Sequence, residues 1–260
     1  MTNAAFFDLD GTLIPGSANI PLAKAAFRQG FISPADLAKD LRNGVSFLLK
    51  GATDQRSAQV RDRILRAVAG HRAEDVEALA DYFLDDLIGS ITPAMRDVLA
   101  QHAHAGDERI VISASPTEIV SRLATEAGLE AGVGTTAARD DNGVYTGELA
   151  GPFCYKHGKV EVMQQLAAER GYNLAECHAY SDSASDLPML QAVGHPVAVN
   201  PEPELREIAE RRGWPIVETS SVPRVRLTSA RGLARMGASL LAAAHRRLQP
   251  APAQAAPEVL

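Results

Sequence analysis

The sequence has few of the residues that mark several large classes of protein. Only 2 of its 260 residues are cysteines, which excludes a disulfide-rich scaffold, and we expect Cys154 and Cys177 to be reduced thiols. Basic residues do not outnumber acidic ones: the chain has 26 Lys and Arg and 32 Asp and Glu, for a formal net charge of -6. Nucleic-acid-binding domains present a basic surface, so we expect no nucleic-acid partner.

Long apolar runs are also missing from the sequence. No stretch of about eighteen apolar residues is available to span a bilayer. The first residues do not combine a basic segment, an apolar segment and a small-residue cleavage site. We therefore expect a cytoplasmic protein. The mean hydropathy of -0.09 and the 46% share of hydrophobic residues are typical of a soluble chain with a full core.

Two aspartates follow the first apolar run. The stretch AAFFDLDGTL, residues 4–13, reads as a short buried strand that Gly11 ends, with Asp8 and Asp10 directly after it. Ligands of open α/β sheets bind at the carboxyl ends of the strands. Two acids this close repel each other unless a cation or a shared proton relieves them. An acidic turn without function is the alternative interpretation of these ten residues taken alone.

The remaining pattern predicts an α/β fold with an insertion. Residues 17–90 show apolar positions at helical spacing and no convincing strand, which predicts an inserted helical unit. Strands are expected at residues 109–112, 177–180 and 196–200, with helices such as 117–128 between them. Strands that alternate with helices favour a Rossmann-like parallel sheet covered on both faces. Asn142-Gly143, between alternating residues, predicts a hairpin.

These elements divide the chain into four parts. We expect a catalytic core formed by residues 1–14 and 91–220 together, and an α-helical cap domain at 15–90. Residues 221–248 form a predicted basic amphipathic helix, and the Pro- and Ala-rich residues 249–260 a disordered tail. The basic helix, with its charges at residues 224–247, would pack on its own core or on a second copy as a homodimer. Attachment to an anionic membrane surface is the less favoured alternative.

Three further groups of polar residues fall near strand or helix ends. Ser113 ends the second predicted strand, and Lys159 begins a helix. Asp182 and Asp186 follow the strand at 177–180. Hydroxyls and amides at a helix start can hold phosphate oxygens, and a lysine offsets phosphate charge. Each feature alone is more often a helix cap or a solvated charge, but their joint occurrence at one sheet edge predicts a metal-and-phosphate pocket.

The histidines show no metal-ligand spacing apart from one pair. His102 and His104 are two residues apart near the end of a predicted helix. We interpret this pair as a solvated helix end.

Taken in order, DLDGT, a strand ending in Ser113, Lys159 and SDSASD resemble the four motifs of the haloacid dehalogenase superfamily of phosphohydrolases. The position of the helical insertion resembles the phosphoserine-phosphatase-like branch, and the resemblance covers about residues 4–218. It implies a Mg²⁺-dependent phosphatase that hydrolyses a small phosphorylated metabolite through an aspartyl-phosphate.

The resemblance also implies the role of each acid. Asp8 would be the nucleophile and Asp10 the general acid and base. Mg²⁺ would be bound by Asp8, the backbone carbonyl of Asp10 and Asp182, with waters completing the shell. Lys159 would be catalytic, and Asp186 would support the metal site through water or orient Lys159.

A second set of residues would hold the phosphate group. By the same resemblance, it comprises Gly11, Thr12, Ser113 and Ala114. Four carboxylates in one pocket need a divalent cation and a lysine to offset them, and the same positive charges stabilise a transferring phosphoryl group.

The residues do not determine the substrate, nor whether water or another acceptor takes the phosphoryl group. Phosphoserine phosphatases carry an acid shortly after the first motif and a Gly pair after the second-motif serine. This chain has no acid between Asp10 and Asp36, and has Ala114-Ser115 where that pair would stand. Phosphoserine hydrolysis proper is therefore one alternative. A phosphotransferase or mutase with the same intermediate is another, and a non-catalytic phosphate-binding module is a third.

Overall fold

A six-stranded parallel sheet forms the centre of the computed structural model, which describes residues 3–31, 61–62 and 65–219. The strand order is β3-β2-β1-β6-β7-β8, and every neighbouring pair is parallel. The strands are β1 (Ala4–Phe7), β2 (Glu108–Pro116), β3 (Ala131–Thr135), β6 (His178–Ser181), β7 (His195–Val199) and β8 (Ile216–Val217). Because the order is not sequential, β1 lies in the middle, between two strands that come more than a hundred residues later in the chain.

Alternate residues of the strands face two separate helical layers. Phe7 packs in one apolar cluster and Phe6 in the other, and neither side chain is exposed. The first cluster is closed by α5 (Leu84–Gly89), α6 (Pro93–Ala105) and α7 (Thr117–Glu126). The second is closed by α8 (His157–Arg170), α9 (Leu187–Gln191) and α10 (Pro203–Arg212). Both faces of the sheet are thus covered, as all-parallel sheets require.

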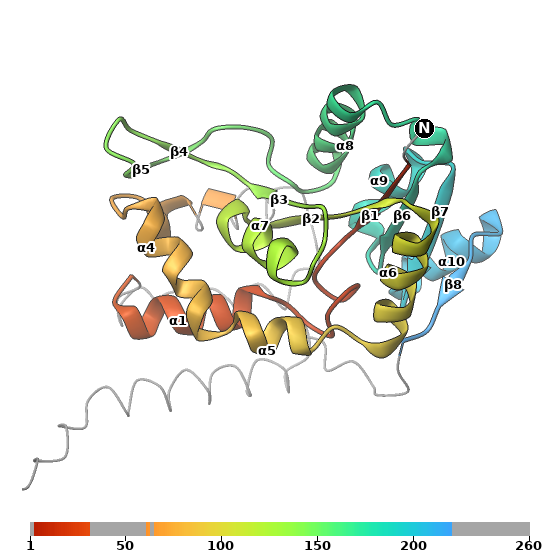
Figure 1. Cartoon of the computed structure of the whole chain (residues 1–260), viewed down its shortest axis with the longest axis horizontal. Coiled ribbons are helices and arrows are strands. Elements are labelled where there is room, and N and C mark those ends of the chain that lie inside the picture. Colours follow the sequence, from red (N-terminus) through yellow and green to blue (C-terminus); the bar gives the residue numbers. More distant parts are fainter. Residues whose placement is uncertain (1–2, 32–60, 63–64, 220–260) are drawn as a thin grey trace, which may run out of the picture.

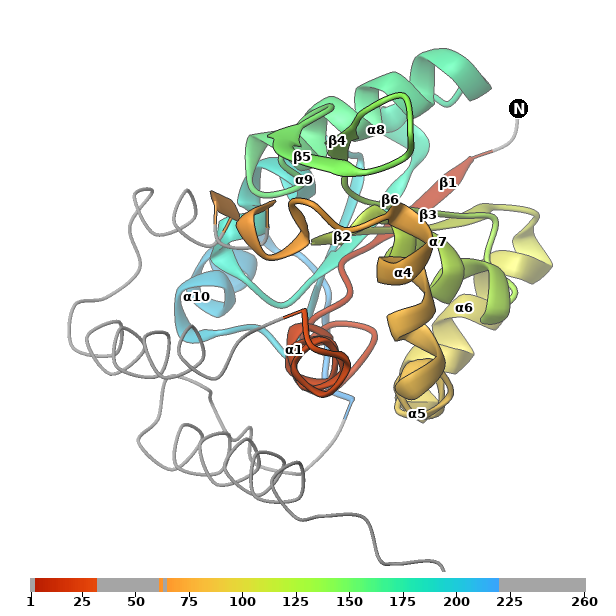
Figure 2. The ribbon, with the colours of Figure 1, turned by 90° about the vertical axis from the view of Figure 1, so that its left-hand side faces the viewer.

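A smaller apolar cluster joins the helical insertion to a hairpin. The described part of the insertion includes α1 (Asn19–Gln29), α4 (Ala73–Ala78) and the 3₁₀ turn η1 (Leu79–Tyr82), and the hairpin comprises β4 (Ala137–Arg139) and β5 (Tyr145–Leu149). Figures 1 and 2 show α4 and the hairpin on the same side of the molecule. The cluster that links them consists of Leu65, Ala73, Val76, Ala137 and Tyr145.

The α/β fold, the parallel sheet and the hairpin predicted from the sequence are confirmed. Two short strands, β3 and β8, were not expected, and β2 extends four residues beyond the predicted end at Ile112. The basic helix at 221–248, its proposed membrane contact at 224–247 and the tail at 249–260 lie outside the described residues. The division into a core and a cap stays a prediction.

One expectation about the histidines is wrong. His104 is exposed as a solvated helix end requires, but His102 is only 7% exposed. Its ring forms hydrogen bonds with Asp107 and Tyr180, because the turn after α6 brings Asp107 back beside it. His102 is therefore part of a buried polar cluster.

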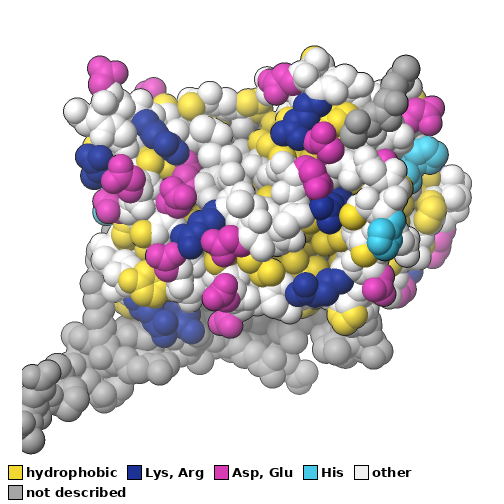
Figure 3. All heavy atoms as spheres, in the orientation of Figure 1, with side chains coloured by type: hydrophobic (Ala, Val, Ile, Leu, Met, Phe, Trp, Pro, Cys, Tyr) yellow, Lys and Arg dark blue, Asp and Glu magenta, His cyan; other side chains and the backbone are white. Residues whose placement is uncertain are grey.

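The surface carries charges of both signs. Figure 3 shows basic and acidic side chains interspersed over the visible face, without an extended field of one sign. None of the described helices is long and apolar enough to cross a bilayer.

Candidate functional site

The predicted site residues come from the carboxyl ends of three neighbouring strands and the start of one helix. Asp8 follows β1, Ser113 lies in the last half of β2, and Asp182 follows β6. Lys159 is the third residue of α8. Because β1 pairs with both β2 and β6 in parallel, the sheet brings these ends together.

Lys159 joins two carboxylates inside the protein. Its ammonium Nζ lies 2.7 Å from Oδ1 of Asp8 and 2.6 Å from Oδ2 of Asp186. The Lys159 side chain is 3% exposed. Ser181, the last residue of β6, donates a hydrogen bond of 2.8 Å to the same Asp186 oxygen. The structure therefore places Lys159 and Asp186 in direct contact, and orienting Lys159 was one of the two roles expected for Asp186.

Burial and the neighbouring acids raise the pKa of Asp8. Burial raises the pKa of Asp8 to about 8; Lys159 opposes this rise, and Asp186, Asp182 and Asp10 add to it. Burial would lower the pKa of Lys159, but Asp186 and Asp8 outweigh it and hold the pKa above its ordinary value. The lysine therefore stays charged, and its single positive charge faces an excess of carboxylates.

The donor set of the site fits a magnesium ion. The Thr12 hydroxyl lies 3.1 Å from Oδ2 of Asp8 and 3.4 Å from Oδ1 of Asp182, so two carboxylate oxygens converge on one small group. A hydroxyl has one proton and can donate to only one of them at a time. Hard carboxylate oxygens from two side chains are ligands that Mg²⁺ prefers, and waters would complete its shell. The residues present thus fit the ion that the sequence predicts.

Asp10 is held by the chain that leads into α1. Its carboxylate accepts hydrogen bonds from the Ser17 hydroxyl at 2.6 Å, the Ala18 amide at 2.9 Å and the Asn19 side-chain amide at 3.4 Å. Burial raises the pKa of Asp10, although the bonds from Ser17 and Ala18 oppose the rise. A carboxyl group in this environment is easier to protonate near neutral pH than a solvated aspartate.

The residues predicted to bind phosphate have different surroundings. Ser113 is 2% exposed, and its hydroxyl accepts a bond of 3.2 Å from the amide of Ser115. The Ala114 carbonyl accepts from the Thr135 hydroxyl at 2.9 Å. Gly11, at φ 83°, donates its amide to the Ile14 carbonyl at 2.9 Å. The positive φ lets the chain turn sharply after Asp10, which is where a glycine is needed.

Three polar residues of the site were missed by the sequence analysis. Ser17 and Asn19 hold Asp10, and Ser181 holds Asp186. Ser181 directly precedes Asp182 at the end of a predicted strand, so its position at the same sheet edge could have identified it as a site residue. Ser17 and Asn19 gave none, because they lie beyond a turn and read as the start of the inserted helical unit.

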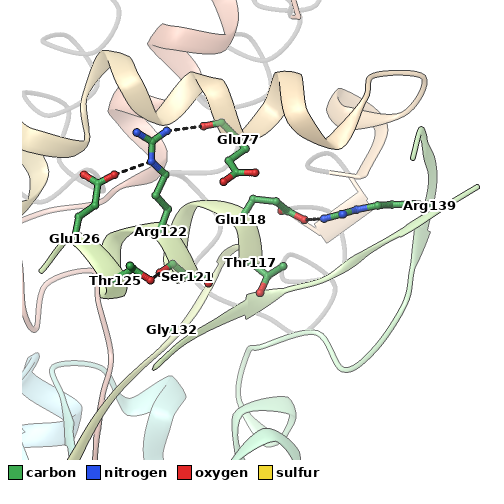
Figure 4. Close-up of a pocket in the computed structure, with 9 residues that line it drawn as sticks. All are labelled: Glu77, Thr117, Glu118, Ser121, Arg122, Thr125, Glu126, Gly132 and Arg139. Carbon is green, nitrogen blue, oxygen red and sulfur yellow. Dashed lines mark hydrogen bonds and ion pairs between the residues drawn. The ribbon is translucent and has the colours of Figure 1, made fainter. Parts of the chain in front are cut away.

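The described residues also form a cavity of about 470 Å³ beside α7, away from the predicted site (Figure 4). Its lining includes none of the predicted site residues. Two arginines line it, and both are neutralised within the protein: Arg122 pairs with Glu126, and Arg139 pairs with Glu118. This cavity is therefore poorly suited to a phosphate group.

Comparison with known protein families and relatives gives a consistent result. Residues 5–191 match the model of haloacid dehalogenase-like hydrolases. A probable phosphatase of Mycobacterium tuberculosis is 38% identical over 218 residues, covering 84% of this chain and 75% of that protein. A phosphoserine phosphatase of the same species is 34% identical over 252 residues, covering 95% and 82%. A histidinol-phosphatase of Neisseria meningitidis is 31% identical over 220 residues, covering 84% and 99%.

Solved structures agree on the fold. A protein of unknown function from Bordetella pertussis superposes with a TM-score of 0.74 at 32% identity, covering 85% of this chain and all of that one. A phosphoserine phosphatase that holds a phospho-aspartyl intermediate analogue superposes with a TM-score of 0.57 at 19% identity, covering 84% and 94%. The second likeness supports the fold alone.

Proposed function

The chain belongs to the haloacid dehalogenase-like hydrolases, and from this membership we propose that it hydrolyses a small phosphate monoester with Mg²⁺, through a phosphorylated Asp8. The observation that carries the proposal is the buried contact of the Lys159 ammonium with both Asp8 and Asp186. A lysine fixed in this way offsets negative charge where a phosphoryl group would arrive.

Asp8 acts as the nucleophile in this proposal. One of its carboxylate oxygens attacks phosphorus, the bond from phosphorus to the ester oxygen breaks, and the phosphoryl group is carried on Asp8 as an acyl phosphate. Lys159 favours the ionised, nucleophilic form of Asp8 by opposing the burial that raises its pKa, and Asp186 and Ser181 fix the lysine in turn. Splitting the reaction into two displacements replaces one difficult step with two easier ones.

Asp10 moves the protons in both steps. Its carboxyl group donates a proton to the departing alcohol oxygen, and the resulting carboxylate takes a proton from the water that attacks phosphorus and releases phosphate from Asp8. The donors Ser17, Ala18 and Asn19 fix the orientation of Asp10 for these transfers. General acid and base catalysis needs a pKa near the working pH, and burial shifts the pKa of Asp10 in that direction.

A magnesium ion would be held by Asp8, Asp182 and the backbone carbonyl of Asp10. It would supply positive charge that neutralises the phosphoryl oxygens. Thr12 lies between the two carboxylates and orients them. Ser113 and Ala114, at the end of β2, would contact the phosphate group.

The inserted helices would contact the organic group of the substrate and so select which phosphate monoester binds. Relatives are named for phosphoserine and for histidinol phosphate, which both carry an amino group. The described segment from Gly11 to Phe31 contains no acid that could bind an ammonium group. These two observations point in opposite directions. The panel of substrates therefore includes amino-alcohol phosphates as well as sugar, nucleotide and lysolipid phosphates.

The experiment measures phosphate release from this panel with and without Mg²⁺, for the wild type, Asp8→Asn and Asp97→Asn. Asp97 is an exposed residue of α6 and serves as the matched control. We expect release from at least one compound that requires Mg²⁺, is unchanged in Asp97→Asn and falls by at least about 10³-fold in Asp8→Asn. Release that survives Asp8→Asn contradicts the mechanism.

The same experiment separates hydrolysis from transfer to another acceptor. If a compound phosphorylates Asp8, free phosphate does not accumulate, and an added alcohol or sugar is converted to its phosphate ester, the chain is a phosphotransferase. Acid-quenched protein, analysed by mass spectrometry for the added phosphoryl mass on the peptide with Asp8, identifies the shared intermediate.

A further inference from the structure

A second cluster of polar side chains lies at the opposite edge of the sheet. It consists of His102 in the last turn of α6, Asp107 just before β2, and His178, the first residue of β6. One ligand atom from each of the three lies within 4.8 Å of the others. The strands are parallel, so this edge is the amino-terminal one, roughly 13 Å from Asp182 along the four residues of β6. The cluster is separate from the proposed catalytic site.

His102 and Asp107 are already positioned for a shared ligand. Nδ1 of His102 lies 2.8 Å from Oδ2 of Asp107, and its other ring nitrogen, Nε2, lies 2.7 Å from the Tyr180 hydroxyl. A histidine that binds a metal through one nitrogen uses the other N–H to fix its ring. Tyr180, which stacks on Phe7 with ring centroids 4.6 Å apart, is a rigid acceptor for that N–H.

One ring nitrogen of His178 lacks the hydrogen bond that a buried polar atom normally makes. Its Nδ1 is buried and has no hydrogen-bond partner. Its ring lies against those of His102 and His195, each with a centroid distance of 4.7 Å. A buried polar atom left without a partner is unfavourable, and such atoms are rare in native proteins. Burial, followed by the neighbouring His102 and His195, lowers the pKa of His178, so its ring is neutral near pH 7 and can bind a metal.

We propose that His102, Asp107 and His178 bind one Zn²⁺ ion at the amino-terminal edge of the sheet. Two imidazoles and one carboxylate are a donor set that suits Zn²⁺, whereas Mg²⁺ prefers oxygen ligands alone. Ligand bonds of about 2.0–2.1 Å place the donors of a tetrahedral ion about 3.3 Å apart, within the range from 2.8 to 4.8 Å found here. Only small side-chain movements are needed.

The ion would take the place of the hydrogen bond between Nδ1 of His102 and Asp107, and an N–H on Nε2 of His102 would then donate to the Tyr180 hydroxyl. Asp107 and His178 are half-buried, so the ion can enter from the surface and a water can occupy the fourth position. Figure 3 shows histidine side chains at the surface on the side of the molecule that carries α6 and β7.

Calorimetric titration of Zn²⁺ into the full chain, with excess Mg²⁺ present to occupy the carboxylate site, tests the proposal. We expect one equivalent of Zn²⁺ to bind the wild type, and His178→Asn to weaken this binding by at least about tenfold. Co²⁺ in place of Zn²⁺ gives a visible absorption band of a tetrahedral site, which His178→Asn should abolish.

Two control variants locate the bound ion. His104→Asn removes an exposed histidine from the same turn of α6, and Asp8→Asn alters the carboxylate site; both should bind Zn²⁺ as the wild type does. Circular dichroism checks the folding of each variant. If His178→Asn does not fold, Asp107→Asn, which keeps the size of the side chain, takes its place. Absence of Zn²⁺ binding to the wild type, or binding lost in Asp8→Asn or His104→Asn but kept in His178→Asn, overturns the proposal.

Discussion

Lys159 forms two buried ion pairs with a single ammonium group, which makes it the residue on which the charge balance of the site depends. Lys159→Met would leave Asp8 and Asp186 buried without their cation. Removing one partner of a buried ion pair costs about 3–5 kcal/mol of unfolding free energy. We expect a loss of this order in urea denaturation at pH 7, together with loss of phosphatase activity.

The matched control for this variant is Arg211→Met, which removes a cation of α10 with a 65% exposed side chain. Exposed ion pairs contribute between about 0 and 1 kcal/mol, so its stability should stay close to that of the wild type. Equal losses in the two variants would show that the site does not depend on the buried contact.

Cys154 gives a prediction about pH. It is 1% exposed, and its thiol donates to the Gly134 carbonyl at 3.0 Å. Burial raises its pKa from 9.0 to about 11, against the opposing charge of Lys159. Because the folded state favours the thiol, its contribution to stability is complete below pH 9 and is lost as the pH rises through 11.

The thiolate is the reactive form, so the same shift of about two pKa units predicts slow alkylation of Cys154. At pH 8, iodoacetamide should modify Cys154 at least about a hundredfold more slowly in the native chain than in urea, as followed by mass spectrometry of its peptide. Similar rates in both states would mean that the thiol is open to solvent.

Among single residues, the sequence alone was sufficient to place Asp8 and Asp182 directly after strands, because the strands before them were predicted. The resemblance left two roles open for Asp186, and its direct contact with Lys159 depends on how α8 crosses the sheet, which the residues alone do not give. The contact of Ser17 with Asp10 was equally hidden. It requires the turn at Gly16, whose φ of 120° is open to glycine and has no signature in the side-chain pattern.

Among the elements, the start of α8 tolerates little change. Gly158 precedes Lys159, and a Cβ atom at Gly158 would lie 1.8 Å from the Phe153 carbonyl oxygen. Gly158→Ala must displace the backbone of the first turn, which we expect to cost about 1–3 kcal/mol in unfolding free energy. The displacement would also move Lys159 and lower kcat.

Gly151→Ala is the control, because a Cβ at Gly151 meets no atom within 4 Å. Thermal unfolding and phosphatase kinetics should leave this variant close to the wild type. If Gly158→Ala were equally stable and active, the first turn of α8 would not fix the lysine.

The strand β3 shows why one element escaped sequence analysis. Its sequence, AGVGT, contains two glycines, which are depleted in strands. The structure explains them: a Cβ at Gly132 would lie 2.2 Å from the Val120 carbonyl oxygen, and one at Gly134 would lie 2.4 Å from that of Ser115. The glycines allow β3 to approach α7 and the end of β2, and this packing requirement outweighs the local preference. The strand β1, whose residues are all apolar, contains no glycine and was predictable.

For the whole molecule, the strand order predicts a gradient of local stability. β1 is central, and all four of its residues are buried, whereas β8 is a two-residue edge strand. Amides of a central strand exchange with solvent only when most of the protein opens, but those of an edge strand exchange through local opening. Hydrogen exchange followed by mass spectrometry should find the slowest amides in β1 and β2. Equal protection in β8 would contradict this order.

The central place of β1 also has a consequence during synthesis of the chain. Ala5 of β1 pairs with Arg109 of β2 on one side and with His178 of β6 on the other. β1 is synthesised before both partners and must therefore wait for the second, which at ~5–20 residues per second takes roughly ten to thirty seconds. During that interval the apolar segment AAFF is available to chaperones and to other nascent chains. The position of one four-residue strand thus delays completion of the sheet until β6 has been synthesised.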